Sequence, residues 1–116
     1  MKKIIEGDIE DYLYSQCKEH GIMCIKQTGL NGIPDRNLVG FGYDVYVETK
    51  KPGEEPREDQ IVIIERLRRR GKIVEIIDSK EQIDDLMKRF DEERKRFEHK
   101  LKRGKKNDNK TSGKRI

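Results

Sequence analysis

The spacing of apolar residues near the start of the chain predicts a helix. Apolar residues recur every three to four positions between Ile4 and about His20, which is the spacing of one face of an α-helix. Gly21 follows, and glycine often ends a helix because it adopts the left-handed conformation without strain. We therefore expect a helix over residues 4–20.

Three short strands are predicted next, from apolar runs that alternate with polar positions. The expected strands cover residues 22–25, 37–39 and 43–50. A glycine-containing loop over residues 26–34 joins the first two strands. The turn Gly40–Gly42 joins the last two as a hairpin, so the three strands form a meander.

A helix and a fourth strand follow the meander. Lys51–Gly53 ends the third strand because its proline lacks a backbone donor. Pro56 fits the first turn of a new helix, which Gly71 ends. The apolar run 73–77 predicts a strand, and since a helix leads into it, it should lie parallel to an earlier strand.

The last predicted element is a long helix. Ser79 and Gln82 form a capping box at its start, and its apolar stripe continues to about Arg103. The residues from Gly104 to Ile116 are rich in Lys, Asn, Ser and Gly and are expected to be disordered. The chain therefore predicts an α/β fold in which helices flank a central mixed sheet. We expect one domain over residues 1–88, with a basic helical extension and tail over residues 89–116.

Charge divides the chain into an acidic body and a basic C-terminal part. Residues 88–116 contain 13 Lys and Arg against 5 Asp and Glu, whereas residues 1–87 contain 14 against 18. Such a basic part neutralises phosphates and holds nucleic acid without reading its bases. A basic run alone is equally consistent with a solvated chain end, so a polyanionic partner needs support from a candidate site.

Length, cysteines and hydropathy exclude several classes of protein. With 116 residues the chain has room for one small domain. Cys17 and Cys24 occur without a CxxC motif or a Cys/His cluster, so we interpret both as packing thiols in a reducing compartment. The sequence has neither a signal-peptide core nor an apolar stretch of 18 residues. We expect a cytoplasmic protein with no membrane partner.

Asp35, Glu48 and Lys50 are the candidate site. Successive side chains of a strand point to opposite faces, so Glu48 and Lys50 share one face while Val45 and Val47 share the other. Asp35 follows a glycine-containing turn and a proline, and it brings a second carboxylate to the same place from a neighbouring strand. Two carboxylates beside a lysine predict a site for Mg²⁺ or Mn²⁺ of the kind that hydrolyses phosphodiesters.

Some of the chemistry at this site stays open at the sequence level. The backbone carbonyl of Thr49 is expected to face the ion as a further ligand. Lys50 either orients or deprotonates the attacking water, or holds the scissile phosphate. In a chain with 43% charged residues, an Asp followed by Glu-x-Lys also occurs in ordinary surface hairpins. Three features favour the site: Glu6 and Glu10 lie one helical turn apart, Gln60 starts the next helix, and Pro52 and Gly53 end the strand.

The order of these features resembles the PD-(D/E)xK nuclease superfamily and, within it, the virus-type replication-repair nucleases, the VRR-NUC family. The matching stretches are Glu6–Glu10, Tyr12–Leu13, Gly32–Arg36, Tyr46–Gly53, Pro56–Gln60, Leu67, Gly71 and Ile77–Ser79. Together they cover residues 4 to about 88. The combination of Gly-x-Pro-Asp, Glu-x-Lys-x-Pro-Gly and the later glutamine is specific, although no single part is.

The resemblance implies a metal-dependent nuclease with the α-β-β-β-α-β core of restriction-endonuclease-like enzymes. Position by position, it makes Asp35 and Glu48 metal ligands, Lys50 the catalytic lysine and Gln60 the glutamine that helps shape the site. It also implies a glutamate from the first helix. Related junction resolvases place it eleven residues before the helix-ending glycine, which is Glu10 here, while many relatives place it at Glu6. We predict Glu10, with Glu6 as an outer or second ligand.

The resemblance also implies a substrate and an assembly. Stand-alone members resemble Holliday-junction resolvases, which implies a homodimer that acts on branched DNA and not on a small molecule. The small size suits a phage or mobile-element protein, which in the case of a phage would work in the bacterial host cell. The residues expected to contact DNA phosphates are Lys51, Arg66, Arg68, Arg69, Arg70, Lys102, Arg103, Lys105 and Lys106. Two alternatives remain: a non-catalytic nucleic-acid-binding domain, and a nuclease of the same fold that cuts linear duplex or flaps.

Overall fold

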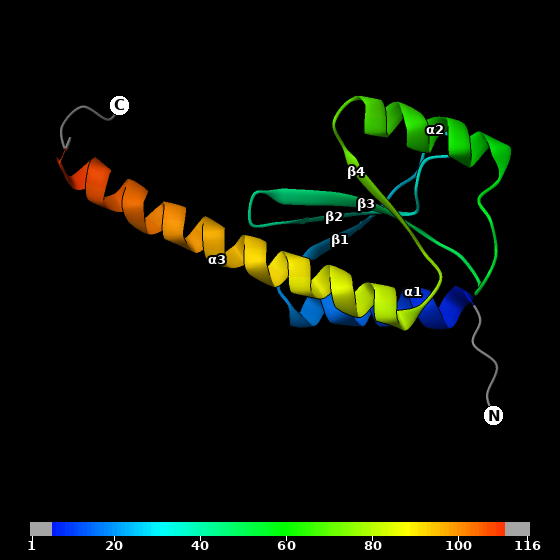
Figure 1. Ribbon diagram of the computed structural model, residues 1–116, viewed down its shortest axis with the longest axis horizontal. Helices are drawn as coiled ribbons and strands as arrows, with labels where there is room; N and C mark the ends of the chain where they lie inside the picture. The colour runs from blue at the N-terminus through cyan, green and yellow to red at the C-terminus, as the bar shows by residue number, and fades with distance from the viewer. Residues whose placement is uncertain (1–5, 111–116) are drawn as a thin grey trace.

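A computed structural model describes residues 6–110 of the chain and the side chains of residues 7–104. Its elements follow the order α1, β1, β2, β3, α2, β4, α3 (Figure 1). Their bounds are α1 Glu6–Glu19, β1 Met23–Lys26, β2 Arg36–Gly40, β3 Tyr43–Thr49, α2 Glu58–Arg69, β4 Ile73–Ile77 and α3 Lys80–Lys110. The predicted α-β-β-β-α-β order is therefore confirmed, and so is the C-terminal helix that follows it.

The four strands form one mixed sheet in the order β1-β2-β3-β4. The first three strands are antiparallel neighbours, with Leu38 opposite Val45 in the β2–β3 hairpin. β4 is reached through α2 and lies parallel to β3, as predicted from the connecting helix. β3, the strand that carries the candidate site, is therefore hydrogen-bonded to a neighbouring strand on each side.

Helices cover both faces of the sheet. In Figure 1, α1 and α3 lie on one face and α2 lies on the other. Val45 and Val47 of β3 are fully buried against the α1 and α3 side, in one apolar cluster with residues of α1, β2, β4 and α3. Because strand side chains alternate, Glu48 is directed away from this cluster, toward α2. The predicted division of β3 into an apolar and a polar face is thus confirmed.

Two helix boundaries differ from the prediction. α2 begins at Glu58 with Arg57 as its N-cap, so Pro56 precedes the helix and does not lie in its first turn. Only half of a capping box forms here: Gln60 Oε1 accepts a hydrogen bond from the backbone N–H of Arg57 at 2.9 Å, whereas the Arg57 side chain has no acceptor for the return bond. The sequence has no Ser, Thr, Asp or Asn at the N-cap position that would predict this helix start. α3 continues to Lys110, beyond the predicted end near Arg103. The expected disorder is therefore wrong for residues 104–110, and residues 111–116 lie outside the described part of the chain.

The start of α3 agrees with the sequence. Ser79 Oγ accepts a hydrogen bond from the backbone N–H of Gln82 at 3.3 Å, and Gln82 Oε1 accepts one from the backbone N–H of Ser79 at 3.1 Å. This reciprocal pair is the predicted capping box. It fixes the turn by which the chain passes from β4 into α3.

Both cysteines are free thiols. Cys17 is buried in the core, and Cys24 packs against it from β1. A hydrogen bond with Cys24, together with burial, raises the pKa of the Cys17 thiol, which keeps it protonated and unreactive. None of the helices in the described part of the chain has the length and apolar composition needed to span a bilayer.

Candidate active site

The candidate residues converge where β3 ends. Asp35 directly precedes β2, Glu48 and Thr49 are the last residues of β3, and Lys50 follows them. Gln60 lies in the first turn of α2. The backbone N–H of Lys50 donates to the carbonyl of Ile77 at 2.8 Å, which continues the β3–β4 pairing past the last residue of the strand. The position of Lys50 is therefore set by the sheet and not by a free loop.

Asp35 and β3 are joined by a reciprocal set of hydrogen bonds. Oδ2 of Asp35 accepts from the Thr49 hydroxyl at 3.0 Å and from the Thr49 backbone N–H at 3.3 Å. In return, the backbone N–H of Asp35 donates to Oε1 of Glu48 at 3.2 Å. Both Thr49 donors act on the same oxygen of Asp35, so its other oxygen, Oδ1, is directed away from that contact.

Gln60 fixes the second carboxylate. Its Oε1 accepts the backbone N–H of Arg57 at 2.9 Å, so its Nε2 faces Glu48 and donates to Oε2 at 2.5 Å. Glu48 and Gln60 are 2% and 4% exposed, respectively. Because one amide joins the helix cap to the carboxylate, the start of α2 and the orientation of Glu48 are coupled.

Lys50 lies beside the same carboxylate. Its Nζ is 3.4 Å from Oε2 of Glu48 and 3.7 Å from Oε1 of Glu54. The side chain of Lys50 is 6% exposed, whereas that of Glu54 is 41% exposed. The ammonium group is thus held between a buried and a more exposed carboxylate.

The electrostatics of this pair favour a bound cation. Burial raises the pKa of Glu48, the neighbouring Asp35 carboxylate raises it further, and Lys50 opposes both effects. One lysine therefore does not fully compensate the negative charge of two adjacent carboxylates, of which Glu48 is buried and Asp35 half-buried. Carboxylate oxygens are ligands that Mg²⁺ and Mn²⁺ prefer, so the donor chemistry of Asp35 and Glu48 fits such an ion. The predicted contribution of the Thr49 carbonyl stays a prediction.

A glycine allows the Asp35 loop to approach α2. Gly32 has a φ of +83°, and a Cβ at this position would collide with the backbone carbonyl of Asp59. Pro34, which follows in the loop, is fully buried. The Gly-x-Pro-Asp motif therefore lets the loop rest on the first turn of α2 while it presents Asp35 to β3.

Glu10 does not join the carboxylate pair directly. It accepts a hydrogen bond from Nη2 of Arg36 at 3.1 Å, and Arg36 is the residue after Asp35. Within the described side chains, no three His, Cys, Asp or Glu residues gather closely enough to hold a metal ion. The side chain of Glu6 lies outside the described set. The role predicted for a glutamate of α1 therefore stays a prediction.

Three contributors to the site were not predicted from the sequence. They are the hydroxyl of Thr49, the side chain of Arg36 and the carboxylate of Glu54. The Arg36 contact depends on the sheet register, since Arg36 pairs with Val47 and so points toward α1. Glu54 lies four residues after Lys50, but residues 50–54 form a turn and not a helix, so this spacing alone does not predict the contact.

The predicted DNA-contact residues are dispersed. Lys51, Lys102 and Arg103 are exposed, and the side chains of Lys105 and Lys106 lie outside the described set. The remaining four, Arg66, Arg68, Arg69 and Arg70, lie at the C-terminal end of α2, roughly 10 Å along the helix from Gln60. Two of these arginines have structural contacts: Arg68 donates to the Val74 carbonyl at 2.7 Å and Arg70 to the Arg66 carbonyl at 3.0 Å.

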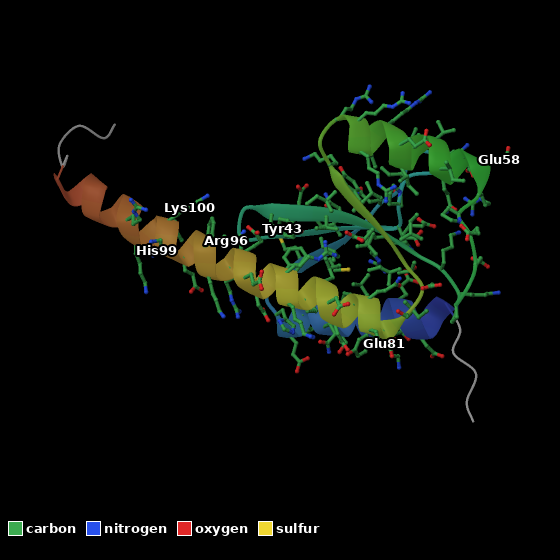
Figure 2. The ribbon with its side chains drawn as sticks, viewed as in Figure 1. Tyr43, Glu58, Glu81, Arg96, His99 and Lys100 are labelled. Carbon is green, nitrogen blue, oxygen red and sulfur yellow. The ribbon has the colours of Figure 1, made fainter. Side chains whose placement is uncertain are left out.

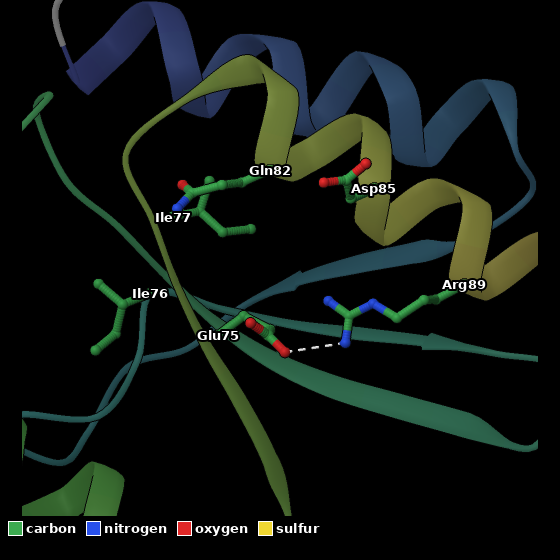
Figure 3. A pocket seen from close by; sticks show the side chains of 6 residues that line it. All are labelled: Glu75, Ile76, Ile77, Gln82, Asp85 and Arg89. Atoms are coloured by element: carbon green, nitrogen blue, oxygen red, sulfur yellow. Dashed lines mark hydrogen bonds and ion pairs between the residues drawn. The ribbon is translucent and has the colours of Figure 1, made fainter.

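A cavity of about 170 Å³ lies elsewhere, between β4 and α3 (Figure 3). An ion pair of 3.0 Å between Glu75 and Arg89 crosses it. Its lining residues are Glu75, Ile76, Ile77, Gln82, Asp85 and Arg89. None of the candidate site residues lines it, so this cavity is separate from the carboxylate pair.

Comparisons with known proteins agree with this geometry. No family model matches the chain. The chain is 36% identical over 85 residues to "Putative nuclease p44" of Acyrthosiphon pisum secondary endosymbiont phage 1, a match that covers 70% of this chain and 90% of the relative. It also resembles a solved structure described as a VRR_NUC domain, with a TM-score of 0.66 and 29% identity, over 72% of this chain and 94% of that one. The chain therefore belongs to the VRR-NUC family of nucleases.

Proposed function

We propose that this protein is a metal-dependent DNA endonuclease whose active site is the end of β3. The observation that carries the proposal is the pairing of half-buried Asp35 with buried Glu48, oriented by Thr49 and Gln60 and bordered by Lys50. A purely structural role does not account for two adjacent carboxylates with a single close cation, because burial of that charge is costly.

Each residue of the site has a proposed task. Asp35 and Glu48 hold Mg²⁺ or Mn²⁺ together with the carbonyl of Thr49. A divalent ion in such a site supplies a nucleophilic water and neutralises charge on the phosphoryl oxygens. Lys50 faces the same region and either orients the water or holds the scissile phosphate. Gln60 keeps Glu48 in its ligand orientation through the contact described above.

The α1 side of the site has a proposed indirect role. Arg36, the residue next to Asp35, donates to Glu10, so Glu10 is connected to the site through a guanidinium group in this structure. We propose that Glu10 acts from this position, with Glu6 as the alternative glutamate of the same helix.

Branched DNA is the proposed substrate, and a homodimer is the proposed assembly. Both proposals rest on family membership, and the absence of tryptophan from the sequence argues only against base stacking as the main mode of binding. Lys51, the arginines at the end of α2 and the basic residues of α3 are proposed phosphate contacts that hold DNA by charge and shape. The proposed place of action is the cytoplasm of a bacterial host.

Cleavage of defined DNA substrates tests the proposal. Purified protein with Mg²⁺ or Mn²⁺ should cut a synthetic four-way junction, and EDTA should stop the reaction. A flap and a linear duplex of the same sequence, assayed beside the junction on denaturing gels, rank the substrates. Equal cutting of the linear duplex would contradict junction preference but not nuclease activity. Binding of all three DNAs without any metal-dependent cutting would favour the non-catalytic alternative.

Thr49→Val tests whether the hydroxyl positions Asp35 for metal binding. Valine keeps the shape, the backbone donor and the carbonyl of this fully buried position but removes the 3.0 Å bond to Oδ2. A hydrogen bond to a charged group contributes about 1.5–3 kcal/mol, so we expect Mn²⁺ affinity to fall roughly tenfold. Isothermal titration calorimetry measures this directly. Thr49→Ser should restore the affinity. If the Thr49→Val protein binds Mn²⁺ as tightly as the wild type, the hydroxyl does not position Asp35 for metal binding.

A further inference from the structure

Asn37 of β2 carries a polar atom that the fold leaves without a hydrogen bond. Its side-chain oxygen Oδ1 is buried, and within the described part of the chain it is the one buried side-chain nitrogen or oxygen that has no hydrogen-bond partner. A buried carbonyl oxygen without a donor destabilises a fold, whereas an apolar side chain of similar size avoids that penalty. The chain therefore keeps an amide at a position where leucine would be the more stable choice.

The two faces of the sheet place Asn37 on the same side as Glu48. In Figure 2, Tyr43 at the start of β3 is directed toward α3, and its ring centroid lies 5.0 Å from that of Phe90. Tyr46 and Glu48 are an odd number of residues away from Tyr43, so they face the opposite way, toward α2. Asn37 lies directly opposite Tyr46 in the β2–β3 ladder and therefore faces α2 as well.

Asn37 is a close neighbour of both carboxylates of the candidate site. Asp35 is two residues before it in the chain, so their Cα atoms are at most about 7 Å apart. Glu48 is its diagonal neighbour across the ladder, a relation that places Cβ atoms roughly 7–8 Å apart. The backbone N–H of Asp35 donates to Oε1 of Glu48 at 3.2 Å, which keeps the start of β2 against that carboxylate. A bridging water spans separations of this kind between polar groups.

The chemistry of an amide oxygen limits what can satisfy it. Oδ1 of Asn37 accepts hydrogen bonds and donates none, so neither a carboxylate nor a phosphodiester oxygen of DNA is a partner for it. Its burial also keeps it out of contact with a large ligand. A small cation or a water molecule remains. Mg²⁺ and Mn²⁺ are ions that keep several of their waters, and outer acceptors of the protein orient the groups around such a metal.

We propose that Oδ1 of Asn37 accepts a hydrogen bond from a water of the divalent-ion site formed by Asp35 and Glu48. The inference rests on the proposed function and adds a positioning residue to it, because Asn37 acts through the water and does not touch DNA. The oxygen is unsatisfied in the metal-free protein and becomes satisfied when the ion brings its water. An ordinary buried water would instead satisfy Oδ1 with or without the ion.

Asn37→Leu tests the inference by separating fold stability from metal affinity. Leucine fills a similar volume and has no acceptor, so the midpoint of urea denaturation in EDTA should be equal to or higher than that of the wild type. Calorimetric Mn²⁺ affinity should fall roughly tenfold or more, which is the usual effect of removing an outer partner of a metal site. Val39→Leu is the matched control, because it places leucine on the same strand and the same face without removing an amide. Its Mn²⁺ affinity should change less than about twofold.

Nuclear magnetic resonance of the wild type gives a second readout that does not depend on the folding of a variant. The side-chain NH₂ signals of Asn37, assigned through its own backbone, should shift when Mg²⁺ is added. Those of Gln16 serve as the reference, because this amide lies on α1 and donates to Glu19 at 3.1 Å. The Gln16 signals should stay in place at Mg²⁺ concentrations that saturate the shift of Asn37.

Several results would overturn the inference. They are an unchanged Mn²⁺ affinity of Asn37→Leu, an equal loss in Val39→Leu, or Asn37 signals that do not respond to Mg²⁺. A large loss of stability of Asn37→Leu in EDTA would also overturn it, because the amide would then be bonded in the metal-free protein. Failure of the proposed function looks different, since the wild type would then bind Mn²⁺ without cutting DNA, and the role of Asn37 at the ion would remain. A wild type that binds no Mn²⁺ would remove both proposals.

Discussion

Lys50→Met should reduce DNA cleavage by at least about a hundredfold while Mn²⁺ binding persists. Methionine keeps much of the buried aliphatic stem but removes the ammonium group 3.4 Å from Glu48. A lysine that acts on the water or the phosphate is needed for the reaction and not for the ion. Loss of the positive charge also removes repulsion of a divalent cation, so calorimetric Mn²⁺ affinity should be equal to or higher than that of the wild type.

The same variant should melt at a lower temperature in EDTA. Lys50 lowers the pKa of Glu48, so its removal leaves the buried carboxylate without its close cation. Added Mn²⁺ should restore much of the lost melting temperature. Lys72→Met is the control, because Lys72 is a 44% exposed surface lysine paired with Asp44. Unchanged cleavage by Lys50→Met would refute a catalytic role, and loss of Mn²⁺ binding together with cleavage would make Lys50 a structural residue of the site.

Gln60→Glu should destabilise the metal-free protein by about 2–4 kcal/mol at neutral pH. Glutamate at this position still accepts the Arg57 N–H, because a carboxylate serves equally well in a capping box. The change therefore preserves the start of α2 and acts on the contact with Glu48, where a donor becomes a second buried negative charge. Urea denaturation in EDTA measures the loss.

The pH dependence identifies the cause of that loss. Two carboxyls in contact raise each other's pKa, so the folded variant holds a proton that the unfolded chain has already released. The loss in free energy of unfolding caused by Gln60→Glu should be largest at pH values above this raised pKa, and it should become smaller as the pH falls through the pKa. Gln60→Met removes both hydrogen bonds of the amide but adds no charge, so its loss should vary less with pH than that of Gln60→Glu. A Gln60→Glu loss that is the same at every pH would show that packing, not charge, explains it.

Much of the fold follows from local patterns in the sequence. The alternation of Val45, Val47 and Glu48 gives β3 its buried and polar faces, and Ser79 with Gln82 marks the start of α3. The start of α2 was misplaced because Arg57 is an unusual N-cap and Pro56 is typical of a first turn. The end of α3 was misplaced because the apolar stripe stops at Leu101, whereas lysine-rich sequence continues a helix without a core face.

The candidate site was predicted in part, for a physical reason. Asp35, Glu48 and Lys50 were found because strand alternation and a proline-stiffened turn place them by local geometry. The hydroxyl bond of Thr49 and the pairing of Glu10 with Arg36 depend on how β2 aligns with β3 and on where α1 packs. Such contacts are set by the tertiary structure, and a single sequence carries little signal for them.

The pairing of β3 with β4 has a consequence for synthesis of the chain. Lys50 is anchored to the carbonyl of Ile77, and the core that supports β3 is completed by Phe90 of α3. A nascent chain that has left the ribosome only as far as Gln60 already contains Asp35, Glu48 and Lys50 but lacks the strand that fixes them. The candidate active site therefore assembles only after β4 and the first part of α3 have been synthesised, and chains that terminate before β4 carry Asp35, Glu48 and Lys50 without the contacts that arrange them.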